Sequence, residues 1–325
     1  MGQNFIKSVL AQDEAVTVST TVTYDLPVNP LSHLLFTVKA LNSTATITDY
    51  SVLGSLLSSV SLVEILFKGS AIVSASLTDL WAMASFAMGW PAGQANLVKT
   101  TGAARSVTVP ILLGRIPYNP LECFPAVRRG ELQMRITYAA AQTGVATLIS
   151  QIETLELPDA NPTAFLKYTT ISKTPSATGD HNVDLPIGND INHILLFGTT
   201  YPTAASYNAS IGKLKLRIDS VDSFYVGNNW ETLHNESRRI ATFPYERQSH
   251  RFADAAAGET DTGYQQQTDP LVEAYALLDF NPLGDDNYLL ATEGRSRVDL
   301  LITADVADAI RIIPAEIIRL LAPTS

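Results

Sequence analysis

Strand-like alternation runs through both halves of this chain and constrains its fold more than any other feature. Residues 15–24 alternate apolar and polar side chains and are rich in β-branched residues, a pattern that favours a half-buried strand. Clusters of Pro, Gly, Asn and Asp separate the segments of this kind and predict turns. The other predicted strands cover residues 34–38, 63–67, 107–113, 132–138, 194–197, 214–218, 274–278 and 298–303. We therefore expect an all-β fold.

A single segment, residues 77–88, follows helical spacing instead. Its apolar positions are Leu77, Leu80, Trp81, Ala84 and Met88. Ser76 precedes the segment and Asp79 follows three residues later, a capping-box arrangement that satisfies free N–H groups at a helix start. Gly89 and Pro91 would end the helix. We expect a short helix between strands, with its Leu80, Trp81 and Ala84 face buried.

The chain also repeats itself weakly. A Pro/Asn/Asp cluster at residues 157–162 lies near the middle of the 325 residues, and apolar positions recur about 165 residues apart. The matched pairs are Leu112 with Leu277, Leu113 with Leu278, Pro117 with Pro282, Leu148 with Ile313, Ile152 with Ile317 and Leu155 with Leu320. We expect two copies of one β-rich domain, residues 15–157 and 163–325, with a linker at 158–162 and an N-terminal arm at 1–14. Residues 146–157 and 310–321 are interpreted as the strands that close each copy.

The charge balance argues against a protein that binds nucleic acid. Acidic residues outnumber basic ones by 32 to 22, the formal net charge is −10, and the basic residues are scattered. A protein that grips DNA or RNA neutralises phosphates with clustered Lys and Arg, so we expect no direct sequence-specific binding. Charged residues make up only 17% of the chain, against about 25% in typical soluble domains. Low charge on a chain of this size predicts that much of its surface contacts other protein.

Motifs that carry catalytic chemistry are missing from the sequence, which holds no Gly-rich phosphate loop, no GxSxG and no HExxH. The single cysteine, Cys123, rules out an intrachain disulfide and a cysteine-based metal site, and we expect it to be a small buried residue. The five histidines lack zinc-ligand spacing, and we expect each on the surface or in a turn: His33, His181, His193, His234 and His250. We predict that the protein is not an enzyme and has no catalytic, cofactor-binding or metal-binding residues.

Two acidic groups and one polar segment admit a functional interpretation. Residues 279–286 resemble a calcium loop, but Leu290 stands where a bidentate Glu should be, so a turn is favoured over an adventitious cation at an interface. Asp219 and Asp222 flank a turn, and nothing nearby supplies a partner for acid/base work. Residues 247–269 are small and polar and predict a long exposed loop, either a functional contact or a merely mobile segment.

Three stretches carry a resemblance to a known family. They are Val-Glu-Ile-Leu-Phe-Lys-Gly at 63–69 leading to the helix at 77–88; Ile-Leu-Leu-Gly-Arg-Ile-Pro at 111–117 with Leu-Glu-Cys-Phe-Pro-Ala at 121–126 and the strand at 132–138; and Asp-Leu-Pro-Ile-Gly-Asn-Asp-Ile at 184–191 followed by Ile-Leu-Leu-Phe at 194–197. Together with the duplication, they resemble the double jelly-roll major capsid proteins of tailless icosahedral viruses with an internal membrane, of the type found in small lipid-containing bacteriophages. That family is identified by strand order and loop character, and the likeness covers nearly the whole chain.

The resemblance implies a fold, an assembly and a location. The fold would be two jelly-roll β-barrels in tandem, with short helices in the connecting loops. Three chains would form a homotrimeric, pseudo-hexagonal capsomer of an icosahedral shell. The implied partners are further copies of the chain, minor capsid, vertex or spike proteins, and an internal lipid membrane. The implied location is the virion capsid, with the host cytoplasm during assembly, which agrees with the lack of a recognisable targeting signal.

The main alternative is a carbohydrate-binding β-sandwich protein, lectin-like or receptor-binding. Tyr201, Tyr207, Tyr225 and Trp230 would then stack on sugars, although core packing explains most of them. A jelly-roll enzyme is disfavoured because the paired histidines of cupin-type sites are missing. A size measurement separates these classes, since a capsid protein should be trimeric or larger.

Overall fold

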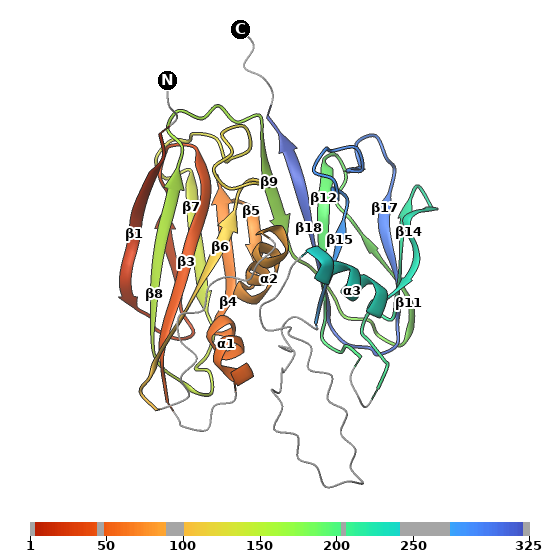
Figure 1. Ribbon diagram of the computed structural model, residues 1–325, viewed down its shortest axis with the longest axis horizontal. Coiled ribbons are helices and arrows are strands. Elements are labelled where there is room, and N and C mark those ends of the chain that lie inside the picture. The colour runs from red at the N-terminus through yellow and green to blue at the C-terminus, as the bar shows by residue number, and fades with distance from the viewer. Residues whose placement is uncertain (1–3, 44–48, 89–100, 203–205, 241–273, 321–325) are drawn as a thin grey trace.

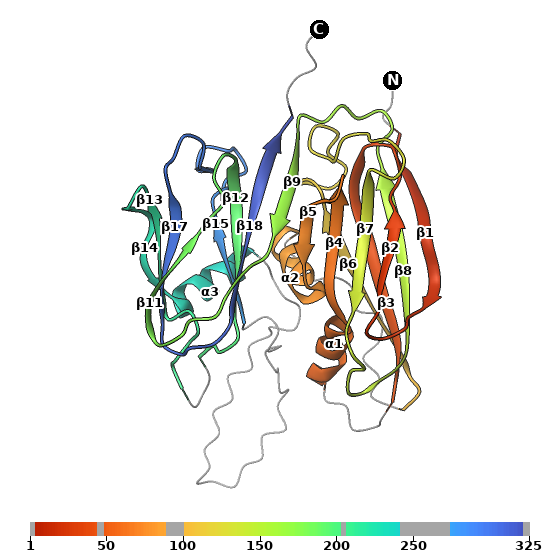
Figure 2. The same ribbon diagram turned by 180° about the vertical axis from the view of Figure 1, so that it is seen from behind.

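The computed structural model shows two β-barrels that stand side by side along the long axis of the molecule (Figures 1 and 2). The structure describes residues 4–43, 49–88, 101–202, 206–240 and 274–320. The residues described at the two ends of the chain lie at the same end of the molecule (Figure 1). None of the described helices is long and apolar enough to cross a lipid bilayer.

The first barrel is built from two facing layers of four antiparallel strands. Its strands are β1 (Ile6–Ala15), β2 (Thr21–Asp25), β3 (Leu31–Asn42), β4 (Val60–Phe67), β5 (Ser70–Ala75), β6 (Ala104–Leu112), β7 (Leu132–Tyr138) and β8 (Val145–Glu156). Hydrogen bonding orders one layer as β1-β8-β3-β6 and the other as β5-β4-β7-β2. This arrangement of eight strands is a jelly roll.

The second barrel repeats the strand order of the first. Its strands are β9 (Ala164–Thr169), β11 (Gly179–Asp184), β12 (Asp190–Gly198), β13 (Lys213–Ile218), β14 (Val221–Asn229), β15 (Tyr275–Asp279), β17 (Val298–Ala304) and β18 (Ile310–Arg319), with the short β10 (Ile171–Lys173) and β16 (Leu290–Ala291) beside β18 and β12. The layers run β9-β18-β12-β15 and β11-β17-β13-β14. In chain order, each strand thus takes the position of its counterpart in the first barrel, which confirms the predicted double jelly roll.

A pair of matching hydrogen bonds fixes the register of the repeat. Asn29 donates to Glu156 at 2.8 Å in the first barrel, and Asn189 donates to Glu316 at 2.8 Å in the second. Residues 29 and 189, like residues 156 and 316, are 160 apart. The predicted offset of 165 therefore pairs the correct closing strands, β8 and β18, in a register that is wrong by five residues. A shift of five residues, an odd number, exchanges the two faces of a strand, so the apolar pairs matched at an offset of 165 do not occupy equivalent positions.

Two predictions near the N-terminus are wrong. Residues 15–24 are not one strand, because the chain turns between β1 and β2, where Ser19 has a positive φ of 57° and the Thr20 hydroxyl donates to the Thr17 carbonyl at 2.7 Å. Residues 1–14 are not an arm over their whole length, because β1 begins at Ile6 and pairs along β8. Threonine is common both in strands and in turns, so the many threonines of this segment gave no sign of the turn between β1 and β2.

Short helices occupy connections between strands. They are α1 (Asp49–Ser58) between β3 and β4, α2 (Leu77–Met88) between β5 and β6, and α3 (Trp230–Ile240) directly after β14. The predicted helix at 77–88 is confirmed at both ends, and the Asp79 N–H donates to the Ser76 hydroxyl at 3.1 Å as its capping box requires. Helix α1 was not expected from the sequence. The predicted loop at 247–269 lies outside the described residues.

The barrels are joined through one layer of each. Strand β5 of the first barrel pairs in parallel with β9 of the second at Val73–Tyr168 and Ser74–Thr169, so that a ten-stranded sheet runs through both. Each barrel keeps its own facing layer and its own apolar interior. The first core also extends onto the outer face of the second barrel, where it includes Leu195, Tyr275, Leu277, Ile313 and Ala315. The two barrels therefore share an apolar surface at their junction.

Candidate functional site

Helix α2 forms the centre of the junction between the two barrels (Figure 1). An amphipathic helix on a barrel surface would expose one face, but α2 buries its side chains all round. The buried positions are Leu77, Asp79, Leu80, Trp81, Ala82, Met83, Ala84, Ser85 and Phe86. One face of the helix packs on its own barrel and the other on the outer face of the second barrel.

A buried ion pair crosses the junction at the start of α2. The Asp79 carboxylate accepts from Arg311 of β18, with Nε–Oδ2 at 2.9 Å and Nη2–Oδ1 at 2.7 Å. The hydroxyl of Tyr275 on β15 donates to the same carboxylate at 2.6 Å. The Arg311 guanidinium also stacks over the Phe197 ring, with Cζ 3.5 Å from the ring centroid. One buried carboxylate thus ties a helix of the first barrel to two strands of the second.

The pKa values follow from this packing. Burial raises the pKa of the Tyr275 hydroxyl well above its usual value, and the Asp79 charge adds to the shift. Burial lowers the pKa of Arg311, but hydrogen bonding and charge attraction from Asp79 outweigh it, so that the net shift is upward. Tyr275 and Arg311 therefore keep one protonation state across the physiological range and act as a fixed structural link.

A groove of about 650 Å³ opens beside this ion pair. Hydroxyl groups dominate its lining, which includes Ser58, Ser61, Ser74, Ser76, Thr78, Thr170 and Ser172. The described residues that line the groove include no histidine and no cysteine. A hydroxyl nucleophile needs an adjacent base, and the one carboxylate in the lining, Asp79, is already committed to Arg311 and Tyr275. Among the described residues, the groove thus offers hydroxyl groups without an uncommitted base beside them.

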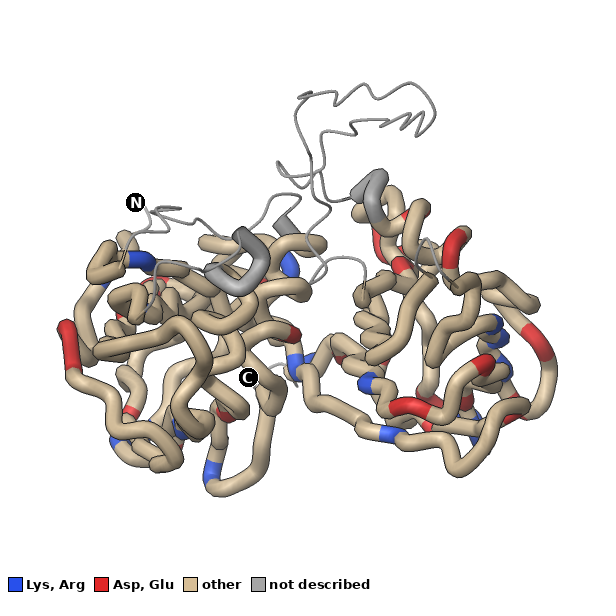
Figure 3. Tube along the Cα trace, turned by 90° about the horizontal axis from the view of Figure 1, so that it is seen from below, with Lys and Arg blue, Asp and Glu red and all other residues tan. Residues whose placement is uncertain are grey.

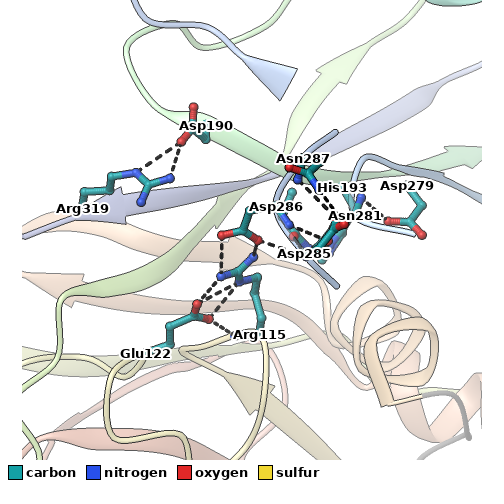
Figure 4. A network of polar contacts seen from close by, with 11 residues as sticks. Arg115, Glu122, Asp190, His193, Asp279, Asn281, Asp285, Asp286, Asn287 and Arg319 are labelled. Carbon is teal, nitrogen blue, oxygen red and sulfur yellow. Dashed lines mark hydrogen bonds and ion pairs between the residues drawn. The ribbon is translucent and has the colours of Figure 1, made fainter. Parts of the chain in front are cut away.

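A second ion-pair cluster crosses the junction at its other end (Figure 4). Arg115, in the loop after β6, donates from Nε to the Glu122 carboxylate at 2.9 and 3.1 Å. Its guanidinium also contacts Asp286 of the second barrel, with Nη2–Oδ2 at 3.2 Å. The hydrogen bonds to Glu122 and to Asp286 hold the pKa of Arg115 above its usual value although burial opposes them. Gly114 allows the loop to close, because a Cβ there would lie 2.0 Å from the Glu122 carbonyl oxygen.

A chain of amides leads from this cluster to a buried histidine. Asn281 donates to the Asn192 side chain at 3.2 Å, and the Asn192 amide contacts His193 Nδ1 at 2.7 Å. The amide must donate in that contact, so Nε2 carries the ring proton and points at the Met83 sulfur of α2, 2.8 Å away. Burial lowers the pKa of His193 to about 4. The neutral ring is therefore part of the packing between the barrels.

The prediction for Cys123 is confirmed and that for the histidines is largely wrong. Cys123 is fully buried beside Leu155 and Leu157, and burial raises its pKa to about 11. Three of the histidines are buried rather than at the surface: His33, His193 and His234. Each of the three places a ring nitrogen within hydrogen-bond distance of a neighbour, which offsets the cost of burial. His181 is half-exposed, and His250 lies outside the described residues.

The acidic groups behave as turn residues. Asp219 accepts from the Ser296 N–H and hydroxyl at 2.9 and 2.6 Å, and Asp222 pairs with Lys215 at 2.8 Å. In residues 279–286, Asp279 caps the Asn281 N–H at 2.8 Å while Asp286 is held by Arg115. Within the described part of the chain, no group of three His, Cys, Asp or Glu side chains could hold a metal ion.

The aromatic residues of the sugar-binding alternative do not form a common surface. Trp230 is buried in the second core, and Tyr201 packs against both cores. The Tyr225 hydroxyl accepts from the Asp279 N–H at 3.1 Å, and its ring packs edge-on against Phe280. Among these four residues only Tyr207, at 87% exposed, presents its ring to solvent. A stacking platform for a sugar needs an accessible aromatic face, so the four do not supply one together.

The residues of the junction carry only a weak signal in the sequence. Asp79 and Arg311 are 232 positions apart, and no local pattern links two such residues. The repeat around His193, however, was readable: Asp-Leu-Pro at 25–27 recurs at 184–186, and Ser32-His33 recurs as Asn192-His193. The two histidines are 160 residues apart, which is the correct register of the duplication, and the Asp-Leu-Pro match, 159 residues apart, agrees to within one residue.

Charges are interspersed over both barrels (Figure 3). One ion pair recurs in the two barrels with its signs exchanged, across equivalent strand pairs. Glu64 of β4 lies opposite Arg135 of β7 and pairs with it at 2.6 Å. Arg217 of β13 lies opposite Asp299 of β17 and pairs with it. In the view of Figure 3 the basic residues do not gather on one face of the kind that would track a nucleic-acid backbone.

Comparison with known proteins identifies the fold. No protein-family model and no curated protein sequence matches the chain. Solved structures do match over nearly its whole length. The major capsid protein of Sulfolobus turreted icosahedral virus is 14% identical, with 97% of each chain covered and a TM-score of 0.64. The major capsid protein of bacteriophage PM2 is 12% identical, with 99% of this chain and all of that chain covered and a TM-score of 0.60.

A capsid protein of PBCV-1 gives a similar result, with 11% identity, 99% of this chain and 96% of that chain covered, and a TM-score of 0.58. These similarities cover nearly the whole chain, and at these sequence identities they show the fold. The chain therefore has the double jelly-roll fold of viral major capsid proteins.

Proposed function

We propose that this protein is the major capsid protein of an icosahedral virus and that three copies form a pseudo-hexagonal capsomer. The observation that carries the proposal is the repeated barrel, which matches structural capsid proteins of virions from end to end. Two barrels of equal strand order give each chain two similar units, and three chains give a ring of six. Such a ring can tile a shell with one kind of contact in nearly equivalent positions.

The composition and the rigid junction support a structural role. Large hydrophobic side chains remain exposed at both ends of the single chain, among them Val9, Val221 and Leu283. Exposed apolar residues in contiguous patches mark surfaces that contact other molecules. The two ion-pair clusters hold the barrels in a fixed relation, as a lattice subunit requires. We propose residues up to 157 and residues 163–325 as the two structural units, with 158–162 between them.

The proposed partners follow from the same role. They are further copies of the chain within and between capsomers, minor capsid, vertex or spike proteins, and an internal lipid membrane. Assembly would take place in the host cytoplasm and the product would be the virion shell. We propose no catalytic activity and no cofactor, and no sequence-specific binding to nucleic acid, because the net charge of −10 would repel phosphates.

The strand registers support one orientation toward the membrane. The first residue of β1 pairs with the last of β8, and the last residue of β6 lies opposite the start of β3, so the loop that follows β6 lies at the end of the molecule where the chain begins. That loop exposes Ile116 and Leu121, and Phe5 is exposed beside them. Apolar side chains at this end would face lipid. Flotation with vesicles of zwitterionic phosphatidylcholine should recover the wild-type protein and lose an Ile116→Ser/Leu121→Ser variant.

The experiment that tests the proposed function is a measurement of assembly. Sedimentation and light scattering of the purified protein at micromolar concentration should give a homotrimer, and electron micrographs of native material should show particles that contain the chain. A stable monomer over a wide range of concentration, with the chain absent from any particle, would overturn the proposal. A glycan array with strong hits would then favour the carbohydrate-binding alternative.

A further inference from the structure

The ten-stranded sheet that runs through both barrels has a gap beside the start of helix α2. Strand β5 lies between β4 and β9, where Ala75 pairs with Val63 of β4 and Ser74 pairs with Thr169 of β9. Strand β5 ends at Ala75, and the chain turns into α2 at Leu77 (Figure 2). The strands on either side continue past this point, so the position that β5 leaves has a strand on both sides.

Both neighbouring strands have an unpaired edge along this gap. In β4, Val60 and Leu62 pair with β7 on one side, whereas the pairing with β5 on the other side begins only at Val63. Strand β10, residues 171–173, pairs with β18, and no other described strand pairs with it. An unpaired strand edge presents N–H and C=O groups that can pair with a further strand.

The gap is one strand wide where it begins. Because β5 separates β4 from β9, those two strands lie two strand spacings apart at the end of β5, which is about 10 Å. The hydroxyl-lined groove of about 650 Å³ occupies this position. Its lining includes Ser61 of β4, Ser172 of β10 and Ala75 at the end of β5. The groove therefore extends from one open strand edge to the other.

The lining of the groove is neutral and consists mostly of small side chains. Its two charged residues, Asp79 and Arg311, pair with each other at 2.7 Å and so present no net charge to a ligand. The hydroxyl groups of Thr78 and Ser172 have no hydrogen-bond partner among the described residues. Small side chains leave room for a further backbone between the two edges, and their hydroxyl groups can donate to or accept from its peptide groups.

We propose that an extended segment of another protein binds in this groove as an added strand, in the line of β5 and between the open edges of β4 and β10. Addition of a strand to an exposed sheet edge is a general mode of peptide recognition, in which main-chain hydrogen bonds provide the affinity. Here the added strand would pair on both sides. It would also continue the seam of β5 and β9 that joins the two barrels.

The same geometry defines the chemistry of the bound segment. Successive side chains of a strand point to opposite faces, so every second one would face the first turn of α2, where Ser76 and Thr78 line the groove. We expect small, uncharged residues at these alternate positions and no proline, which cannot donate to a neighbouring strand. The inference goes beyond the proposed function, because the groove lies within a single chain.

A peptide library tests the groove without a known partner. The library consists of capped hexapeptides built from Gly, Ala, Ser, Thr and Val, and the purified protein should select members of it. A fluorescein-labelled copy of the tightest member should then bind in a polarisation assay. N-methylation of either alternate set of its amides removes the donors on one side of the strand and should weaken binding about tenfold or more. Equal binding of the N-methylated peptides, or the selection of no peptide, would overturn the proposal.

Two substitutions place the bound peptide in the groove. Thr78→Trp fills the groove at the start of α2, and Ser172→Tyr narrows it from the side of β10. Each should weaken binding of the labelled peptide about tenfold or more, while a circular-dichroism melt shows that the fold is kept. Thr303→Trp, on β17 and outside the groove, is the matched control and should bind as the wild type does. Unchanged binding in both groove variants would show that the peptide binds elsewhere.

Hydrogen exchange gives a readout that needs no substitution. In the free protein, amides of residues 60–62 and 171–173 that face the groove have no partner strand and should exchange quickly. With the selected peptide bound, exchange in both segments should slow. Slower exchange in other parts of the chain alone would contradict the added strand.

The outcomes separate the groove from the proposed function. A trimer that selects no peptide overturns the added strand alone and leaves the capsid function standing. Self-association that is lost in Thr78→Trp and Ser172→Tyr but kept in Thr303→Trp would show that a second copy of the chain fills the groove. That result would overturn the assignment of the groove to another protein.

Discussion

At the scale of single residues, we expect substitution of the buried Asp79 carboxylate to lower the free energy of unfolding strongly. Asp79→Asn keeps the shape of the side chain but removes the charge that holds Arg311 and Tyr275. Breaking one partner of a buried pair leaves an uncompensated charge and typically costs about 3–5 kcal/mol. We expect a loss of that size in the free energy of unfolding, measured by urea titration at fixed protein concentration. The control is Asp222→Asn, whose solvent-accessible pair with Lys215 should be worth about 0–1 kcal/mol; equal losses would contradict the junction's role.

The buried histidines predict a dependence of stability on pH. Burial lowers the pKa of His193 and of His33 to about 4, from an ordinary value of about 6.5 in the unfolded chain. Between about pH 6.5 and about pH 4, these histidines are protonated in the unfolded state and neutral in the folded state. The free energy of unfolding therefore falls as the pH drops through this range. Each histidine contributes up to about 1.4 kcal/mol per pH unit in this range.

Urea titrations at pH 7, 6 and 5 measure this slope. His193→Gln should make this slope shallower, because glutamine does not titrate. An unchanged slope in His193→Gln would show that the ring is protonated inside the folded junction.

At the scale of elements, helix α2 packs against both barrels and should contribute more to stability than its twelve residues suggest. Trp81 is 1% exposed within it. Trp81→Ala removes a large buried ring and should cost about 3–5 kcal/mol in the free energy of unfolding. Tyr207→Ala, at a position 87% exposed, is the aromatic control and should cost nothing measurable. A loss below about 1 kcal/mol for Trp81→Ala in the same urea titration would show that the helix is peripheral.

Helices and strands could be predicted from the sequence where the pattern that marks them lies within the element itself. The helix at 77–88 carries its own cap and stop, and strand β7 alternates without a break, so both were placed at the correct residues. Strand β14 was missed because it is irregular: its register against β13 shifts twice, and Phe224 has a positive φ of 57°. Such bulges destroy the two-residue period on which strand prediction depends.

The candidate site was harder to predict than the fold because it lies between elements. Arg115 and Asp286 come from loops in different barrels, and each alone is an ordinary turn residue. The junction is stable because its side chains are buried, and their burial depends on the packing of two complete barrels. No short stretch of sequence carries a pattern that predicts such burial. Only the repeated Ser32-His33 and Asn192-His193 pairs could have pointed to equivalent positions before the structure was known.

At the scale of the whole molecule, the two barrels are coupled and should unfold together. The sheet continues from β5 into β9, and the first core includes Leu195, Tyr275 and Ile313 of the second barrel, so separating the barrels would expose apolar surface on both. Two such domains with a mostly polar interface would unfold in separate steps. Here we expect one transition for both barrels.

Single-tryptophan variants can test this coupling barrel by barrel. Trp81 reports on the first barrel and the junction, and Trp230 is buried in the second core. Variants that keep only one of these two, with the other and Trp90 both replaced by Phe, therefore follow different parts of the molecule. Their fluorescence midpoints in urea should coincide at equal protein concentration. Adding Arg311→Met to each should lower both midpoints together, because the ion pair with Asp79 stabilises the junction rather than either barrel. Midpoints that separate in the parent variants would show two independent barrels, in which case the angle between them would be set by neighbouring copies in the shell and not by the chain itself.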